Sequence, residues 1–254
     1  MRTNTRGQAL VALVTTSDAF PKRDEAIREL QAAFPEIIGL WQNIQPEKTS
    51  VILGPTWRHL AGAKQIEETI GPYSFLVSPG AFLQVNTGAA AVLYDAAAAA
   101  LGHGGRKFDL ALDLYCGTGT LTLWAARAAR RVVGVEENRD AVKDAWKNAE
   151  RNGVKNARFS VGRVESVLPR MRQELSGEAA ALVDPPRAGC TVPVLRALTN
   201  RAFKRLVYVS CNPATFARDA AYLSKAGFTL AGVQPVDLFP QTSHVELVGR
   251  FDRA

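Results

Sequence analysis

The chain has 254 residues, of which 47% are hydrophobic and 22% are charged, and its formal net charge at pH 7 is +7. This composition fits an ordinary globular protein of one large or two modest domains, and no apolar run approaches the roughly 20 residues that cross a bilayer. Three scattered cysteines argue against a disulfide framework, and the spacing of cysteine and histidine gives no metal site. We therefore expect a cytoplasmic protein with no membrane segment and no metal.

The charge is unevenly distributed along the chain. Residues 1–78 carry eight basic and eight acidic residues, whereas residues 79–254 carry 23 and 16. A basic excess confined to one part of a chain favours an anionic partner there, of which nucleic acid is the commonest.

Residues 1–78 predict a small α+β domain. Hydrophobic periodicity indicates a helix over residues 21–34, ended by Pro35. The expected strands of this unit, including a hairpin around Gly71-Pro72, cover residues 8–16, 37–44, 50–53, 65–70 and 73–77.

Residues 79–254 predict a doubly wound, mainly parallel sheet of seven strands. An alanine-rich helix over residues 87–101 comes first, and strands then alternate with helices until a final antiparallel pair. The expected strands cover residues 108–115, 131–136, 157–161, 179–184, 204–210, 228–238 and 245–251.

The first strand–helix turn of this sheet has the form of a nucleoside-cofactor site. Two glycines in the run from Tyr115 through Gly117 to Thr120 allow a sharp turn toward a helix N-terminus. Glu136 ends the next strand, where a carboxylate can hold both hydroxyls of a ribose. A third glycine for a pyrophosphate is absent, which favours S-adenosylmethionine over NAD.

Two further strands end in chemically capable residues. Asp184 and Arg187 flank a Pro-Pro pair that stiffens the loop after the fourth strand. Cys211 ends the fifth strand, just before Asn212-Pro213, and we expect Thr215 to cap the helix that follows. A thiol facing a helix N-terminus is expected to have a lowered pKa, although a small buried hydrophobe is the competing interpretation of a cysteine.

Glu246 supplies the carboxylate that a thiol nucleophile would need. It lies within an apolar strand, where a carboxylate is costly unless it is partnered or used. Addition of a thiolate to carbon 6 of a uracil makes carbon 5 nucleophilic toward a sulfonium methyl, and a base must then remove the carbon 5 proton. Cys211 and Glu246 are the candidates for these two tasks.

These motifs resemble those of the RNA uracil-5 methyltransferases, which make 5-methyluridine in tRNA or 23S rRNA. The resemblance runs from about residue 36 to the end and rests on Phe82–Asn86, Asp113–Gly117, Asp184–Arg187, Ser210–Thr215 and His244–Glu246.

The resemblance implies a Rossmann-like, seven-stranded methyltransferase domain that methylates a flipped-out uridine, with Cys211 as nucleophile and Glu246 as proton acceptor. The implied RNA partner is tRNA or rRNA, and the small domain is the expected RNA-contacting unit. The implied S-adenosylmethionine-binding residues are Gln84, Tyr115, Glu136 and Asp184, to which we add Gly117 and Thr120 from the turn and, for the substrate, Arg187 and Asn212.

The chain also departs from larger bacterial members of that family. It contains neither their N-terminal β-barrel nor the cysteine cluster that holds an iron–sulfur centre in some of them, so we expect no such cluster. Arg163 stands where many methyltransferases carry an acidic or amide residue near the adenine. A fragment and a naturally short, monomeric form both fit these departures.

Three alternatives remain from the residues. A 5-methylcytosine RNA enzyme uses the same thiol chemistry but usually places a cysteine where Asp184 stands. An amino-group methyltransferase would carry an aromatic residue where Arg187 stands. A non-catalytic RNA-binding or folding factor would account for the basic charge alone.

Overall fold

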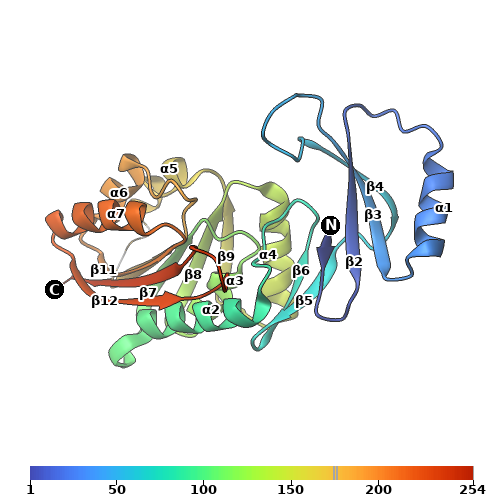
Figure 1. The fold of residues 1–254 in the computed structure, drawn as a ribbon. Coiled ribbons are helices and arrows are strands. Elements are labelled where there is room, and N and C mark those ends of the chain that lie inside the picture. Colours follow the sequence, from blue (N-terminus) through green and yellow to red (C-terminus); the bar gives the residue numbers. More distant parts are fainter. Residues whose placement is uncertain (174, 176, 254) are drawn as a thin grey trace.

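The structure is a computed structural model that describes residues 1–173, 175 and 177–253. Figure 1 shows the first part of the chain, in blue, beside a larger α/β unit that carries the C-terminus. In the part of the chain that is described, no helix is both long enough and apolar enough to cross a membrane.

The N-terminal part forms a four-stranded sheet in the order β1-β2-β3-β4. β2 and β3 are parallel, and α1 connects them, while β1 and β4 pair antiparallel at the two edges. These elements are β1 Arg2–Thr3, β2 Ala9–Thr15, α1 Arg23–Ala33, β3 Ile37–Ile44 and β4 Thr56–Gly62.

The prediction of a strand over residues 50–53 was wrong. The apolar side chains of Val51 and Ile52 are exposed, and the strand that pairs with β3 begins at Thr56. Asn43 explains the difference, because its side chain both accepts from the Gly54 N–H at 2.6 Å and donates to the Gly54 carbonyl at 2.9 Å. This clamp holds the segment as a loop, so that its run of β-branched residues has no strand to pair with.

A separate hairpin, β5 Ile66–Ile70 and β6 Tyr73–Val77, follows the small sheet as the sequence predicted. Tyr73 and Phe75 pack against Trp124, a fully buried ring of the larger unit. The Trp124 Nε1–H donates to Asp95 at 2.8 Å, so this large side chain is buried without an unpaired polar atom.

The larger unit is built on a seven-stranded sheet in the order β12-β13-β11-β10-β7-β8-β9. Its strands agree with the predicted ones to within two residues at each boundary, and the central strands β7, β10 and β11 are buried apolar runs. They are β7 Phe108–Leu114, β8 Ala129–Glu136, β9 Ala157–Val161, β10 Ala179–Val183, β11 Phe203–Ser210, β12 Thr229–Val236 and β13 Glu246–Asp252.

Helices cover both faces of this sheet, and each face has its own hydrophobic core. One core joins the hairpin with α2 Thr87–Gly102, α3 Thr120–Ala125 and α4 Arg139–Arg151. The other joins α5 Val164–Val167, α6 Val192–Leu198 and α7 Pro213–Lys225. Two short 3-10 helices, His103–Gly105 and Arg170–Gln173, complete the elements of the described residues.

The predicted antiparallel end of the sheet is confirmed, with one feature that the sequence did not reveal. β13 does not simply follow β12 at the edge but is inserted between β12 and β11, antiparallel to both. The start of β13 therefore lies at the same edge of the sheet as the ends of the parallel strands.

Candidate active site

The candidate catalytic pair lies on two hydrogen-bonded strands. β11 and β13 pair in a register that sets Ser210 opposite Leu247, so the next positions along, Cys211 and Glu246, face each other at the carboxyl edge of the sheet. Glu246 is only 4% exposed, and Cys211 is half-buried. The fold thus brings together a thiol and a carboxylate that are 35 positions apart in sequence.

The thiol does not have the lowered pKa that its place before a helix suggested. Partial burial raises the pKa of Cys211, and the negative charges of Glu246 and Asp184 raise it further, while Arg187 acts in the opposite direction. Burial and the two carboxylates outweigh the Arg187 guanidinium, so the net effect of the site is to raise the pKa of this thiol.

Both carboxylates are themselves shifted toward the neutral state. Burial raises the pKa of Glu246, and Arg187 limits this effect. Burial, together with the charges of Glu246 and Asp113, raises the pKa of Asp184 to about 7. Carboxyl groups poised in this way can accept a proton near neutral pH.

The loop that carries Arg187 is fixed to the start of α7. The Asn212 side chain and the Thr215 hydroxyl both donate to the Arg187 carbonyl, at 3.1 and 3.2 Å. The cap of α7 differs from the predicted Thr215: Asn212 accepts from the Ala214 N–H, because Pro213 fits the first helical position without needing a partner.

The glycine turn after β7 is held by Glu136. One carboxylate oxygen of Glu136 accepts from the Gly117 N–H at 3.2 Å, and the other accepts from the Asn138 N–H at 2.7 Å. Tyr115, which begins the turn, has φ of +67°, a left-handed conformation that non-glycine residues seldom adopt. Such strain is typical of functional loops that the surrounding structure holds in place.

A cavity of about 910 Å³ opens at this edge of the sheet. It is large enough for a nucleoside ligand together with a base. Eight of the ten predicted site residues line it: Gln84, Tyr115, Gly117, Glu136, Asp184, Arg187, Cys211 and Glu246. Thr120 lies instead at the first position of α3, and Asn212 is engaged in the α7 cap.

Sequence reasoning missed several residues of the cavity wall. Phe82, 71% exposed, and Phe239 both line the cavity, as does His244, which contacts the Phe239 ring and lies 3.3 Å from an Arg187 nitrogen. Phe82 lies two residues before the predicted Gln84 in the motif Phe82–Asn86, and an aromatic residue within that motif was the available signal. Arg163 also lines the cavity, where its guanidinium is paired with Glu165.

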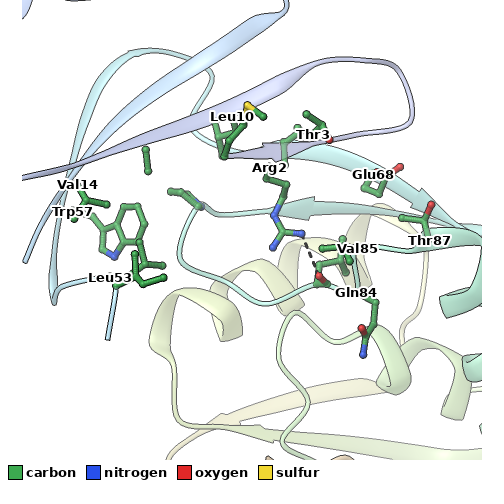
Figure 2. A pocket seen from close by; sticks show the side chains of 16 residues that line it. Arg2, Thr3, Leu10, Val14, Leu53, Trp57, Glu68, Gln84, Val85 and Thr87 are labelled. Atoms are coloured by element: carbon green, nitrogen blue, oxygen red, sulfur yellow. Dashed lines mark hydrogen bonds between the residues drawn. The ribbon is translucent and has the colours of Figure 1, made fainter. Parts of the chain in front are cut away.

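The segment that carries Gln84 is positioned by the small sheet. Arg2 of β1 donates to the carbonyls of Ala81 and Leu83, at 3.0 and 3.4 Å. Figure 2 shows Arg2 directed toward this segment, within a second cavity of about 380 Å³. Gln84 lines both cavities, so the N-terminal unit contributes to the wall of the candidate active site.

The residues present fit S-adenosylmethionine. Glu136 offers carboxylate acceptors beside a glycine turn, which suits a ribose, and the apolar Val164 lies on the cavity wall with Pro185. Asp184 offers a second carboxylate for a cationic group. Among the described residues, no group of three or more histidine, cysteine, aspartate or glutamate side chains could hold a metal ion.

The fold and the site define a class of protein, the S-adenosylmethionine-dependent methyltransferases. A putative enzyme of this class from Streptococcus mutans shares the fold, with a TM-score of 0.59 and 13% identity over 95% of this chain and 69% of that one. The chain belongs to the tRNA (uracil-5-)-methyltransferase family, whose sequence model matches residues 71–251.

Individual relatives agree with this family assignment. Uncharacterised RNA methyltransferases of Oceanobacillus iheyensis and Gloeobacter violaceus are each 42% identical, over 94% and 98% of this chain. The structure of Pyrococcus abyssi tRNA (uracil-54, C5)-methyltransferase in complex with S-adenosyl-L-homocysteine matches with a TM-score of 0.77 and 27% identity, over 98% of this chain and 58% of that one. The chain spans about half the length of the two curated relatives, 52% and 53%.

Proposed function

We propose that this chain carries the catalytic part of an enzyme that transfers a methyl group from S-adenosylmethionine to carbon 5 of a uridine in tRNA or rRNA. The observation that carries the proposal is the register of β11 and β13, which sets Cys211 opposite Glu246 at the wall of one cavity. Membership of the tRNA (uracil-5-)-methyltransferase family supports the same reaction.

In this proposal the cofactor lies along the glycine turn. Glu136 holds the ribose, Tyr115 and Gly117 border the nucleoside, and Asp184 and Gln84 face the methionine end. When bound, S-adenosylmethionine supplies an electrophilic methyl group.

Cys211 acts as the nucleophile on the target base. Its sulfur, as thiolate, forms a bond to carbon 6, and the electron pair of the 5,6 double bond moves toward the 4-carbonyl and makes carbon 5 nucleophilic. Arg187, which lowers the pKa of this thiol, stabilises the thiolate, and we assign it a role in substrate binding as well. Asn212 contributes by fixing the loop of Arg187.

Glu246 acts as the base in the second half of the reaction. After carbon 5 has taken up the methyl group, the Glu246 carboxylate accepts the proton of carbon 5. The electron pair of that C–H bond re-forms the 5,6 double bond, and the carbon–sulfur bond breaks to return the Cys211 thiolate. The raised pKa of Glu246 makes it a stronger base than an exposed glutamate.

The test uses RNA that contains 5-fluorouridine, because fluorine cannot leave as a proton. With S-adenosylmethionine and such RNA, we expect a covalent protein–RNA adduct that survives denaturing electrophoresis. Cys211→Ala should form no adduct and no 5-methyluridine in unmodified tRNA or 23S rRNA, whereas Cys190→Ala, which removes a buried thiol, should retain both. A covalent adduct formed by Cys211→Ala, or transfer of a labelled methyl group from S-adenosylmethionine to an exocyclic nitrogen, would overturn the mechanism.

A further inference from the structure

Helix α4 presents a ladder of polar side chains to the backbone of β6 and of Ser78, the residue after it. Asp144, Asn148 and Asn152 are spaced four residues apart and so lie on one face of the helix. Four residues of a helix rise by about 6 Å, and two residues of a strand by about 6.6 Å. Successive side chains of this helix face are therefore spaced to meet alternate residues of an extended chain. The Asp144, Asn148 and Asn152 side chains accept hydrogen bonds, in that order, from the backbone N–H groups of Ser78, Leu76 and Ser74, at 2.7, 2.7 and 3.0 Å.

Asn148 differs from its neighbours in the ladder because it also bonds to the glycine turn after β7. Its Nδ2 donates to the carbonyl of Leu76 at 3.1 Å and to the carbonyl of Thr118 at 3.0 Å. Its side chain is fully buried, and its oxygen is taken by the Leu76 N–H. The amide therefore joins the hairpin to the middle of the glycine turn, between Gly117 and Gly119.

The same helix is joined to the turn at two other points, once through Glu136 and once directly. Asn138, which caps α4, shares the Glu136 carboxylate with the Gly117 N–H. At the far end of the turn, a Cβ on Gly119 would come within 3.1 Å of the Ala145 Cβ, so the turn lies directly on the helix. Helix α4 thus contacts the turn at Thr118 and Gly119, and Glu136 links its N-cap to Gly117.

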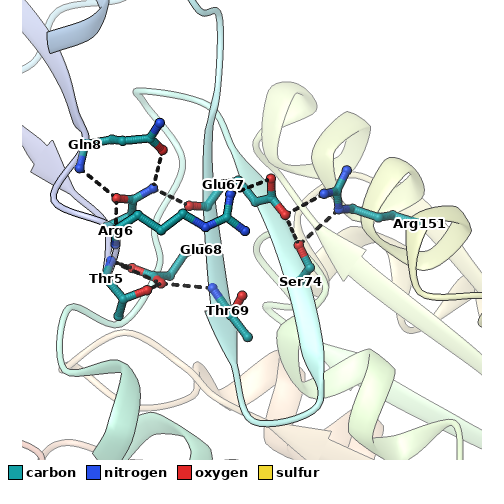
Figure 3. A network of polar contacts seen from close by, with 9 residues as sticks. Thr5, Arg6, Gln8, Glu67, Glu68, Thr69, Ser74 and Arg151 are labelled. Atoms are coloured by element: carbon teal, nitrogen blue, oxygen red, sulfur yellow. Dashed lines mark hydrogen bonds and ion pairs between the residues drawn. The ribbon is translucent and has the colours of Figure 1, made fainter. Parts of the chain in front are cut away.

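The hairpin that forms the other side of the ladder is itself anchored. Figure 3 shows Glu67 between the Arg151 and Ser74 side chains on one side and Arg6 on the other, and Glu68 bound to Thr5. β6 is therefore a fixed reference against which Asn148 can hold the turn.

We propose that Asn148 is a positioning residue for the cofactor: its amide holds the Thr118 carbonyl so that the Gly117 backbone stays at the cavity wall. This inference rests on the cofactor site of the proposed function. Asn148 does not line the cavity, so it acts through the turn and not by contact with the ligand. An apolar side chain here would leave the Thr118 carbonyl without this partner, which loosens the turn.

Asn152 offers a matched control on the same face of the helix. Its amide makes the same pair of bonds to a residue of β6, accepting from the Ser74 N–H and donating to the Ser74 carbonyl at 2.7 Å. Its remaining donor contact is to the Asn148 carbonyl of its own helix, not to the glycine turn. Asn152→Ala therefore weakens the ladder and leaves the Thr118 contact in place.

The experiment compares Asn148→Ala with Asn152→Ala by amide hydrogen exchange without ligand and by calorimetric binding of S-adenosyl-L-homocysteine. We expect Asn148→Ala to speed exchange over residues 116–120 and to weaken binding roughly tenfold, the effect of one lost buried hydrogen bond. Asn152→Ala should speed exchange only in the hairpin. If Asn148→Ala does not fold, as judged by thermal melting, Asn148→Ser and Asn152→Ser make the same comparison.

Unchanged exchange over residues 116–120 in the Asn148 variant, or an equal change there in the Asn152 variant, would overturn the positioning role. A failure of the proposed function would be distinguishable from this result. A wild-type protein that does not bind S-adenosyl-L-homocysteine would contradict the cofactor site, whereas the exchange measurement needs no ligand.

Discussion

At the scale of single residues, the chemistry of the site is set by neighbours that lie far apart in the chain. Cys211 precedes a helix, which by itself lowers the pKa of a thiol. Burial, together with the charges of Glu246 and Asp184, reverses that effect, and each of these carboxylates has a raised pKa in turn. The three groups form one coupled set, in which removing a charge from one changes the proton affinity of the others.

Replacing Glu246 by glutamine should make the Cys211 thiol more reactive. The substitution removes a negative charge that raises the pKa of Cys211, so the thiolate fraction at pH 8 should increase, by up to about tenfold for each unit of pKa. The rate of alkylation by iodoacetamide, resolved by peptide mass mapping, measures this change. Cys116 and Cys190 are buried, with raised pKa values, and serve as internal controls.

The same variant should separate the two halves of the reaction. Glutamine cannot serve as the proposed acceptor of the carbon 5 proton, so a methylated covalent adduct with ordinary uridine RNA should accumulate while 5-methyluridine formation slows strongly. Denaturing electrophoresis measures the adduct. Slower alkylation of Cys211, or normal release of product, would contradict the role of Glu246.

Asp113 should make the protein less stable as the pH rises. It is fully buried below the glycine turn, accepts from the Thr122 hydroxyl, and burial raises its pKa to about 7. The folded state therefore keeps a proton that the unfolded state releases near pH 4. The stabilisation that this proton gives the folded state is complete below about pH 4 and is lost as the pH rises through 7. Urea unfolding of wild type and Asp113→Asn at pH 5 and pH 8 measures this contribution. We expect the change in unfolding free energy between pH 5 and pH 8 to be smaller in the variant. An equal difference in both proteins would contradict this assignment.

At the scale of elements, strand ends and helix starts determine where each functional group lies. The buried apolar runs of the sheet are local signals, which is why the predicted strands agree with the observed ones. The two predictions that failed did so for different reasons. Asn43 of β3 holds residues 50–53 as a loop, whereas α7 starts earlier than predicted, so that the neighbouring Asn212 replaces Thr215 as its cap.

The glycine turn after β7 provides an element-scale prediction. Gly119 has φ of +83°, and a Cβ there would lie 3.1 Å from both Ala145 and Phe159, so Gly119→Ala combines backbone strain with overpacking and should cost about 2–4 kcal/mol of unfolding free energy. Gly117 also has positive φ but open space around it, so Gly117→Ala should cost only about 1–2 kcal/mol. Denaturant unfolding measures both, and equal losses would contradict the packing of the turn on α4.

At the scale of the whole molecule, the small sheet and the larger unit meet through the hairpin. β6 bonds to α4 of the larger unit, and β5 bonds to the N-terminal segment, while Arg2 holds the segment that carries Gln84. A division of the chain near residue 78 stays a prediction, and these contacts make the hairpin the element that connects its two sides.

The uneven charge of the molecule predicts salt-dependent RNA binding. The whole net charge of +7 arises in residues 79–254, and cations that neutralise phosphates release counterions from the RNA. We expect the affinity for unmodified tRNA to fall roughly tenfold or more between about 50 and 200 mM salt. Fluorescence anisotropy measures this, with S-adenosyl-L-homocysteine binding in the same buffers as a control. An affinity that does not change with salt would contradict an electrostatic RNA surface.

The sequence by itself determined the kind of fold and most of the lining of the site. Buried runs, turn-forming glycines and prolines are local features, and they placed Tyr115, Glu136, Asp184 and Cys211 at the ends of strands of one sheet. Only the tertiary structure decided which groups face each other. β13 enters the sheet between β12 and β11, a choice of partner between segments distant in sequence. This insertion sets Glu246 opposite Cys211, where its charge adds to burial in raising the pKa of the thiol.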